Sequence, residues 1–193
     1  MQRTRRLPGW LYAGGSRQDR LRDPDVVVDA LRVQPGHVVG DLGPGYGHFT
    51  VRLARAVAPD GVVYAIDADP STLEDLRAAA GQRGLANLRT VSVSRDRLDI
   101  PEPVDLLFVS ATYHHLRDPA SYFADARSYL RPGGRVAILE SRSEGLLARW
   151  MNPHATHPKR ILGDMARAGF TLVTTHDVVS GHWFGDFRAR PDH

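Results

Sequence analysis

Short apolar runs of strand length alternate along this chain with stretches of helical periodicity. The apolar runs lie at 38–42, 62–66, 88–93, 104–109 and 135–140. Segments with apolar residues three and four positions apart separate most of them, at 46–58, 69–83 and 118–130, and another lies at 158–168. Such alternation predicts an α/β fold, a mostly parallel sheet with helices on both faces. Alternating residues at 170–179 and 182–188, around Ser180-Gly181, predict a terminal antiparallel hairpin and seven strands in all.

Three Asp-Pro pairs mark the expected starts of helices. They are Asp23-Pro24, Asp69-Pro70 and Asp118-Pro119. An acid is favoured at the N-cap of a helix, and proline is favoured at the first helical position. We therefore expect helices to begin at residues 24, 70 and 119.

The first apolar run ends in the glycine-rich sequence Asp41-Leu42-Gly43-Pro44-Gly45-Tyr46-Gly47. Glycine permits positive φ and lets the backbone pass close to a ligand. The amides at the start of the following helix favour an anionic group. A dinucleotide turn, G-x-G-x-x-G, needs a third glycine at position 48, where this chain has His48.

An acid ends the second predicted strand. Asp67 follows the glycine-rich turn by about 20 residues, the spacing at which an acid accepts both hydroxyls of a ribose. This feature indicates an adenosine ligand. It does not distinguish a nicotinamide dinucleotide from an adenosyl cofactor.

Polar residues also follow the fourth apolar run, where Ser110 is followed by Ala111-Thr112-Tyr113-His114-His115. In an open α/β sheet the ligand binds beyond the carboxyl ends of the strands. We therefore expect 110–115 to face the bound ligand. The turn Leu130-Arg131-Pro132-Gly133-Gly134 precedes the fifth run.

These motifs together resemble the class I S-adenosylmethionine-dependent methyltransferases over residues 24–189, most closely the compact bacterial small-molecule enzymes. The resemblance rests on the D-x-G-x-G-x-G pattern at 41–47, the L-R-P-G-G turn and the Tyr-His-His segment. It implies a Rossmann-like three-layer α/β/α sandwich, S-adenosyl-L-methionine as cofactor and S-adenosyl-L-homocysteine as product. The cofactor-binding residues that it implies are Asp41, Gly43, Gly45, Gly47, Asp67, Ala68, Ser94, Arg95 and Ser110. In the family the loop after strand 3 often carries an acid for adenine; here either Ser94 takes its place or Asp96 supplies it.

The same resemblance suggests where the reaction takes place. Methyl transfer from a sulfonium depends mainly on alignment, and a histidine is the usual base where the acceptor must lose a proton. Tyr113, His114 and His115 are the predicted catalytic residues; the alternative is that one histidine packs against the next helix. The predicted substrate-binding residues come from 1–22 and 143–157, or a second subunit contributes. They are Trp10, Tyr12, Trp150 and His154.

Composition narrows the possibilities. The chain has 193 residues, taken as one domain over 1–193, with no cysteine, so disulfides and thiolate–zinc sites are excluded. One lysine, Lys159, cannot build the Lys-Asp-Lys-Glu tetrad of ribose 2′-O enzymes. No apolar run reaches the roughly 18 residues of a membrane span. The absence of cysteine is consistent with a cytoplasmic protein, which we expect. The net charge of +3 includes six arginines in the arm 1–22, which we interpret as a solvated terminus or a pocket lid rather than a nucleic-acid site.

We expect a small-molecule O-, N- or C-methyltransferase without a metal, either monomeric or homodimeric. Three alternatives stay open at this stage. The first is an S-adenosylmethionine-binding enzyme that catalyses a cyclisation or decarboxylation. The second is a non-catalytic partner protein that uses its basic N-terminus. The third, a nicotinamide oxidoreductase, is disfavoured by His48.

Overall fold

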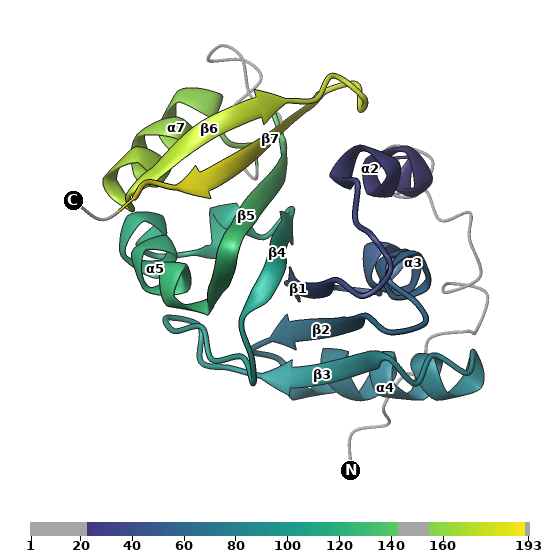
Figure 1. Cartoon of the computed structure of the whole chain (residues 1–193). Coiled ribbons are helices and arrows are strands. Elements are labelled where there is room, and N and C mark those ends of the chain that lie inside the picture. The colour runs from purple at the N-terminus through teal and green to yellow at the C-terminus, as the bar shows by residue number, and fades with distance from the viewer. Residues whose placement is uncertain (1–22, 143–154, 192–193) are drawn as a thin grey trace.

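One seven-stranded sheet forms the centre of the fold, as the alternation of apolar runs predicts (Figure 1). The computed structural model describes residues 23–142 and 155–191. The strand order is β3-β2-β1-β4-β5-β7-β6, with the first five strands parallel and β7 antiparallel to both β5 and β6. The strands are β1 (Val38–Leu42), β2 (Val62–Asp67), β3 (Leu88–Ser92), β4 (Val104–Ser110), β5 (Leu130–Ser141), β6 (Phe170–Thr175) and β7 (His182–Ala189).

Helices cover both faces of the sheet and bury one apolar cluster on each side. On one face lie α2 (Pro24–Leu31), α3 (His48–Ala56) and α4 (Pro70–Gln82). On the other lie α5 (Pro119–Ala126) and α7 (Pro158–Arg167). The predicted three-layer α/β/α sandwich is confirmed. Between β3 and β4 the chain runs as a loop, from which Leu98 and Ile100 fill the core on the α5 face.

Two of the three Asp-Pro pairs cap their helices as predicted. Asp69 accepts a hydrogen bond from the Ser71 N–H at 3.0 Å, and Asp118 accepts one from the Ser121 N–H at 3.1 Å. Asp23 differs, because it has φ 38° and its side chain makes no capping hydrogen bond. The first helix therefore starts with the fixed φ of proline alone.

The predicted turn at 131–134 lies inside β5 instead of before it. Val104 pairs with Leu130, but Leu106 pairs with Arg135, so β5 holds extra residues opposite β4. Gly133 absorbs the irregularity with φ 81°. Because Leu130 already pairs as a strand residue, the helix predicted at 118–130 ends at residue 126 and a 3₁₀ turn, η3 (Arg127–Tyr129), follows. The strand predicted at 170–179 is also shorter than expected and ends at residue 175.

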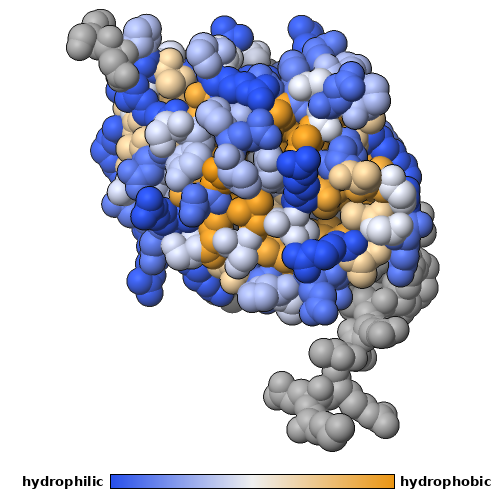
Figure 2. All heavy atoms as spheres, turned by 60° about the horizontal axis from the view of Figure 1, so that its bottom comes forward, coloured by the Kyte–Doolittle hydropathy of each residue, from blue (hydrophilic) through white to orange (hydrophobic). Residues whose placement is uncertain are grey.

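Hydrophilic residues cover most of the face drawn in Figure 2, and hydrophobic residues gather near its middle. Among the described residues, no helix is both long and apolar enough to cross a membrane.

Candidate functional site

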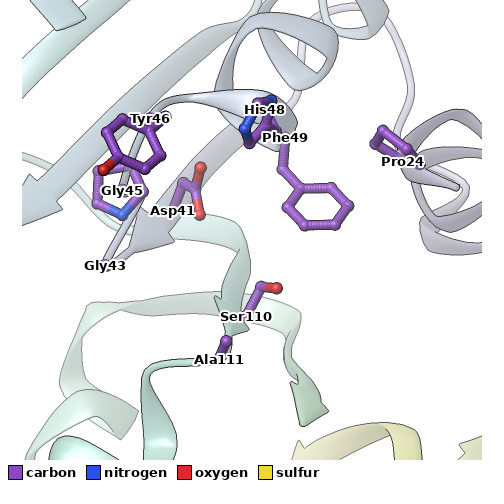
Figure 3. A pocket seen from close by; sticks show the side chains of 10 residues that line it. Pro24, Asp41, Gly43, Gly45, Tyr46, His48, Phe49, Ser110 and Ala111 are labelled. Carbon is purple, nitrogen blue, oxygen red and sulfur yellow. The ribbon is translucent and has the colours of Figure 1, made fainter. Parts of the chain in front are cut away.

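Two pockets lie at the carboxyl ends of the parallel strands, one on each side of the glycine-rich turn. The smaller pocket, of about 210 Å³, contains Asp41 and is called the Asp41 pocket (Figure 3). The larger pocket, of about 370 Å³, contains Asp67 and is called the Asp67 pocket. They share three residues, Gly43, Gly45 and Ala111. One elongated ligand that passes the turn would therefore occupy both.

All three glycines of the turn have positive φ, at 69°, 52° and 79° for Gly43, Gly45 and Gly47. A Cβ at Gly43 would overlap the Thr112 side chain, and one at Gly47 would overlap Leu76, so these two glycines are required by packing. A Cβ at Gly45 would meet nothing within 4 Å. The bare backbone at Gly45 leaves room for a ligand, as the predicted cofactor requires.

The Asp67 pocket combines a carboxylate with apolar walls. The Asp67 side chain accepts a hydrogen bond from the Asp69 N–H at 2.9 Å, which fixes the carboxylate at the end of β2. Ile66 and Leu116 are among the apolar lining residues. This arrangement suits a sugar beside a flat apolar ring. The predicted cofactor residues that line this pocket are Gly43, Gly45, Asp67, Ala68, Ser94 and Arg95.

The Asp41 pocket has two buried polar groups on its floor. Asp41 is 2% exposed, and its carboxylate accepts a hydrogen bond from the Thr50 hydroxyl at 2.6 Å. The Ser110 hydroxyl is buried and has no hydrogen-bond partner among the described residues. Figure 3 shows Asp41 and Ser110 around one space, with Phe49 at its edge. This pocket therefore offers hydrogen-bond acceptors to a ligand that carries a positive, donating group.

Burial raises the pKa of Asp41 from 3.8 to about 7; the hydrogen bond from Thr50 opposes the shift, and the charge of Asp67 adds to it. The folded protein therefore keeps a proton on Asp41 that the unfolded chain releases at lower pH. The contribution of protonated Asp41 to the free energy of unfolding is fully present below pH 3.8, and it is lost as the pH rises to about 7.

We expect Asp41→Asn to remove this pH dependence. Wild type should lose on the order of 4 kcal/mol of unfolding free energy through Asp41 between acid and neutral pH, at about 1.36 kcal/mol per pKa unit. The ligand-free variant should not show this loss. The measurement is denaturant unfolding of both proteins at several pH values. Parallel stability curves for the two proteins would show that Asp41 has an ordinary pKa.

The predicted catalytic residues lie on one 3₁₀ turn, η2 (Tyr113–His115), directly after β4. With three residues per turn, consecutive side chains point in different directions. Tyr113 is 1% exposed and packs against Phe123, and its hydroxyl donates a hydrogen bond to Asp164. Burial and that hydrogen bond raise the pKa of Tyr113. Because the Tyr113 hydroxyl is held in the core by Asp164, it is not available to the reacting atoms.

The two histidines are placed differently from Tyr113. His115 lines the Asp67 pocket, and its ring centroid lies 4.0 Å from that of His114. The Nδ1 atom of His114 lies 3.1 Å from a carboxylate oxygen of Glu140. Glu140 is the penultimate residue of the neighbouring strand β5 and is 0% exposed, and its other oxygen has no hydrogen-bond partner among the described residues. A buried carboxylate on Nδ1 fixes the imidazole tautomer and orientation.

The sequence did not single out Glu140, whose carboxylate lies beside His114. Its signal in the sequence was an acid at the end of the fifth apolar run, 135–140. His48 and Tyr46, which line the Asp41 pocket, were also missed.

The four predicted substrate-binding residues, Trp10, Tyr12, Trp150 and His154, lie outside the described residues. His157 lies within them and caps α7 by accepting a hydrogen bond from the Lys159 N–H at 3.1 Å. Within 23–142 and 155–191, no group of three His, Asp or Glu side chains is arranged to hold a metal ion.

Comparison with known proteins identifies the family. The family model of a methyltransferase domain matches residues 34–174, so the chain belongs to this methyltransferase family, whose cofactor is S-adenosyl-L-methionine. A ubiquinone/menaquinone biosynthesis C-methyltransferase of Pasteurella multocida is 30% identical over 58% of this chain and 43% of the relative. A demethylmenaquinone methyltransferase of Roseiflexus castenholzii is 36% identical over 66% of this chain and 52% of the relative. The chain thus spans about half the length of these curated relatives.

The fold is also that of solved methyltransferase structures. A SAM-dependent methyltransferase from Aquifex aeolicus superposes with a TM-score of 0.77 and 21% identity over 94% of this chain and 98% of that one. At this identity the likeness concerns the fold.

Proposed function

We propose that this domain transfers a methyl group from S-adenosylmethionine to a small molecule with an acidic hydroxyl group, of the phenol or hydroquinone kind. The observation that carries the proposal is the glycine-rich turn, open at Gly45, that joins a pocket built around Asp67 to one built around Asp41. This pair of pockets matches a ligand with a nucleoside at one end and an amino acid at the other.

Asp67 would accept the ribose hydroxyls, and the apolar walls and Ser94 would hold the adenine ring. Asp41 would attract the ammonium group at the amino-acid end, since a buried carboxylate gains most from an opposite charge. Ser110 offers a further acceptor in the same pocket.

When bound, this cofactor supplies an electrophilic methyl group on a sulfonium, which is transferred by in-line displacement. The residues of the chain hold the two reactants in line and exclude water. His114 would take the proton of the acceptor on Nε2, because the Glu140 carboxylate favours the tautomer with the proton on Nδ1. Glu140 is a positioning residue, since it acts through His114.

Two observations favour a hydroxylated ring as acceptor. A histidine base is useful where the acceptor atom loses a proton near neutral pH, as a phenol or hydroquinone does. One relative is named as a ubiquinone/menaquinone biosynthesis C-methyltransferase, and another as a demethylmenaquinone methyltransferase. We further propose that the arm 1–22 and the insert 143–157 roof the acceptor, through Trp10, Tyr12, Trp150 and His154, in a single cytoplasmic domain or its homodimer.

The cofactor is tested by calorimetric titration with S-adenosylmethionine, S-adenosylhomocysteine and NAD. We expect micromolar binding of the two adenosyl ligands and none of NAD. Binding of NAD alone, or of no ligand, would overturn the proposal.

The acceptor is tested with a panel of a hydroquinone, a phenol, a primary amine and a carboxylic acid. Mass spectrometry would detect the gain of one methyl group in place of a hydrogen. We expect methylation of the hydroquinone or the phenol. Methylation of the amine alone would contradict the acceptor class and leave the cofactor assignment in place.

A further inference from the structure

The turn that carries the two histidines is attached to α7 by a hydrogen bond in the protein core. Tyr113, the first residue of η2, donates from its hydroxyl to Asp164 on α7. Both side chains are buried, and the Tyr113 ring stacks on Phe123 of α5 with an interplanar angle of 13°. Helices α5 and α7 lie on the same face of the sheet (Figure 1). The bond therefore joins the end of β4 to a helix far away in sequence.

Asp164 is an unusual residue for the core side of a helix. A carboxylate that is 5% exposed is costly unless it is paired. Arg167 reaches one of its oxygens at 2.6 Å, and Arg160 lies 3.7 Å from the other. The oxygen of Asp164 that faces Arg160 is the one that accepts the hydrogen bond from the Tyr113 hydroxyl. Phenylalanine at position 113 and an apolar residue at position 164 would fill the same space without any buried charge, so packing alone does not explain the pair.

The neighbouring residue on the turn is the proposed base. His114 follows Tyr113 directly, and the Glu140 carboxylate lies 3.1 Å from its Nδ1. Tyr113 and His114 are consecutive residues of one three-residue turn, so a movement of the Tyr113 ring would shift the backbone that carries His114. Two buried carboxylates thus act on one short turn: Glu140 on the imidazole directly, and Asp164 on the backbone through Tyr113.

We propose that Tyr113 and Asp164 are a positioning pair, which fixes the η2 turn so that His114 meets Glu140 in a single orientation. This proposal rests on the proposed role of His114 as the base. Neither residue touches a reactant. Their effect is on the tautomer and orientation of the His114 ring.

The chain contains a matched control. Tyr64 is also buried, and its hydroxyl donates to Glu102 at 2.8 Å, but Glu102 precedes β4 at the opposite end of the sheet. Tyr113→Phe and Tyr64→Phe each remove one phenol hydroxyl that is bonded to a carboxylate. Only Tyr113→Phe should affect the histidines.

The test is nitrogen NMR of the imidazole rings in protein labelled with ¹⁵N-histidine, at about pH 8.5, two units above the ordinary histidine pKa. The signals of His114 are identified by their loss in His114→Gln. We expect wild type and Tyr64→Phe to show one tautomer with the proton on Nδ1. In Tyr113→Phe we expect loss of the single tautomer and averaged signals from both.

Two substitutions on α7 make the result independent of one variant. Asp164→Leu removes the same hydrogen bond from the other side and should give the same averaged signals. Asp164→Asn keeps an acceptor oxygen and should restore the single tautomer. A single Nδ1–H tautomer in both Tyr113→Phe and Asp164→Leu would overturn the positioning role, as would equal averaging in Tyr64→Phe.

This readout needs no cofactor or acceptor, so it separates the two proposals. S-adenosylmethionine titrations of the same variants should give the wild-type affinity, because Tyr113 and Asp164 line neither pocket. If wild type binds no S-adenosylmethionine but the His114 tautomer changes in Tyr113→Phe as expected, the proposed function is wrong and the positioning role of Tyr113 and Asp164 is supported. If wild type binds and methylates while the tautomer does not respond, the pair falls alone.

Discussion

His114→Ala is expected to lower the rate of methyl transfer roughly 10²- to 10⁴-fold while leaving the affinity for S-adenosylmethionine unchanged. The imidazole lines neither pocket, so its loss should not disturb cofactor binding. The substitution would remove the group that takes the acceptor proton, and it would leave the buried Glu140 carboxylate without the imidazole that it orients. The measurement is the initial rate of S-adenosylhomocysteine formation with the acceptor found in the panel, together with calorimetry.

The matched control for this variant is His37→Ala. His37 lies before β1, at the amino end of the sheet, where its Nδ1 accepts a hydrogen bond from the Gln34 N–H at 3.2 Å. We expect wild-type turnover from it. Wild-type turnover from His114→Ala as well would return His114 to a packing role, and the proposed base would have to be abandoned.

Gly45→Val is expected to weaken S-adenosylmethionine binding at least roughly 100-fold, about 2.8 kcal/mol at 1.4 kcal/mol per tenfold. The side chain would enter the open space at Gly45, between the two pockets, where we place the middle of the cofactor. Gly43 and Gly47 are less useful positions, because substitutions there would collide with Thr112 and Leu76 and disturb the fold. Calorimetry measures the affinity, and thermal unfolding shows whether the variant is folded.

Positive φ makes valine unfavourable at Gly45 whatever the ligand does, so this variant needs a control for backbone strain. Gly36 provides it, with φ 86° and nothing within 4 Å of an added Cβ, in the turn before β1. Gly36→Val should lose similar stability but keep its affinity for the cofactor. Equal affinities in the two variants would place the ligand away from the turn.

The parts of the fold that were predictable depend on local rules. A buried parallel strand needs an apolar run, and the first helical turn favours proline, so the strands and three helix starts could be read directly. The glycine-rich turn and Asp67 could be placed at the ligand site, since the carboxyl ends of parallel strands meet there. Asp23 shows the limit of these rules, because the proline alone starts that helix.

The rest depends on contacts between distant segments. In Tyr113-His114-His115 nothing local shows which ring turns inward. That is decided by Asp164, which lies 51 positions further on, and by Phe123. In the sequence Glu140 is only an acid at the end of an apolar run, and the alignment of β4 with β5 brings it to His114. The extra residues of β5 resembled a plain turn because strand pairing is not visible in one segment.

The junction of the two pockets has a consequence for turnover. Gly43, Gly45 and Ala111 offer nothing larger than a methyl group there, while the carboxyl groups of Asp41 and Asp67 lie at the two ends. The sulfur of S-adenosylmethionine, which loses its methyl group and its charge in the reaction, would lie in the middle of the bound cofactor. The protein would therefore make its fewest specific contacts with that part. The product, S-adenosylhomocysteine, would keep nearly all the contacts that hold S-adenosylmethionine. The domain would then be subject to strong product inhibition. Its rate in a cell would follow the ratio of S-adenosylmethionine to S-adenosylhomocysteine, and therefore the speed at which another enzyme removes S-adenosylhomocysteine.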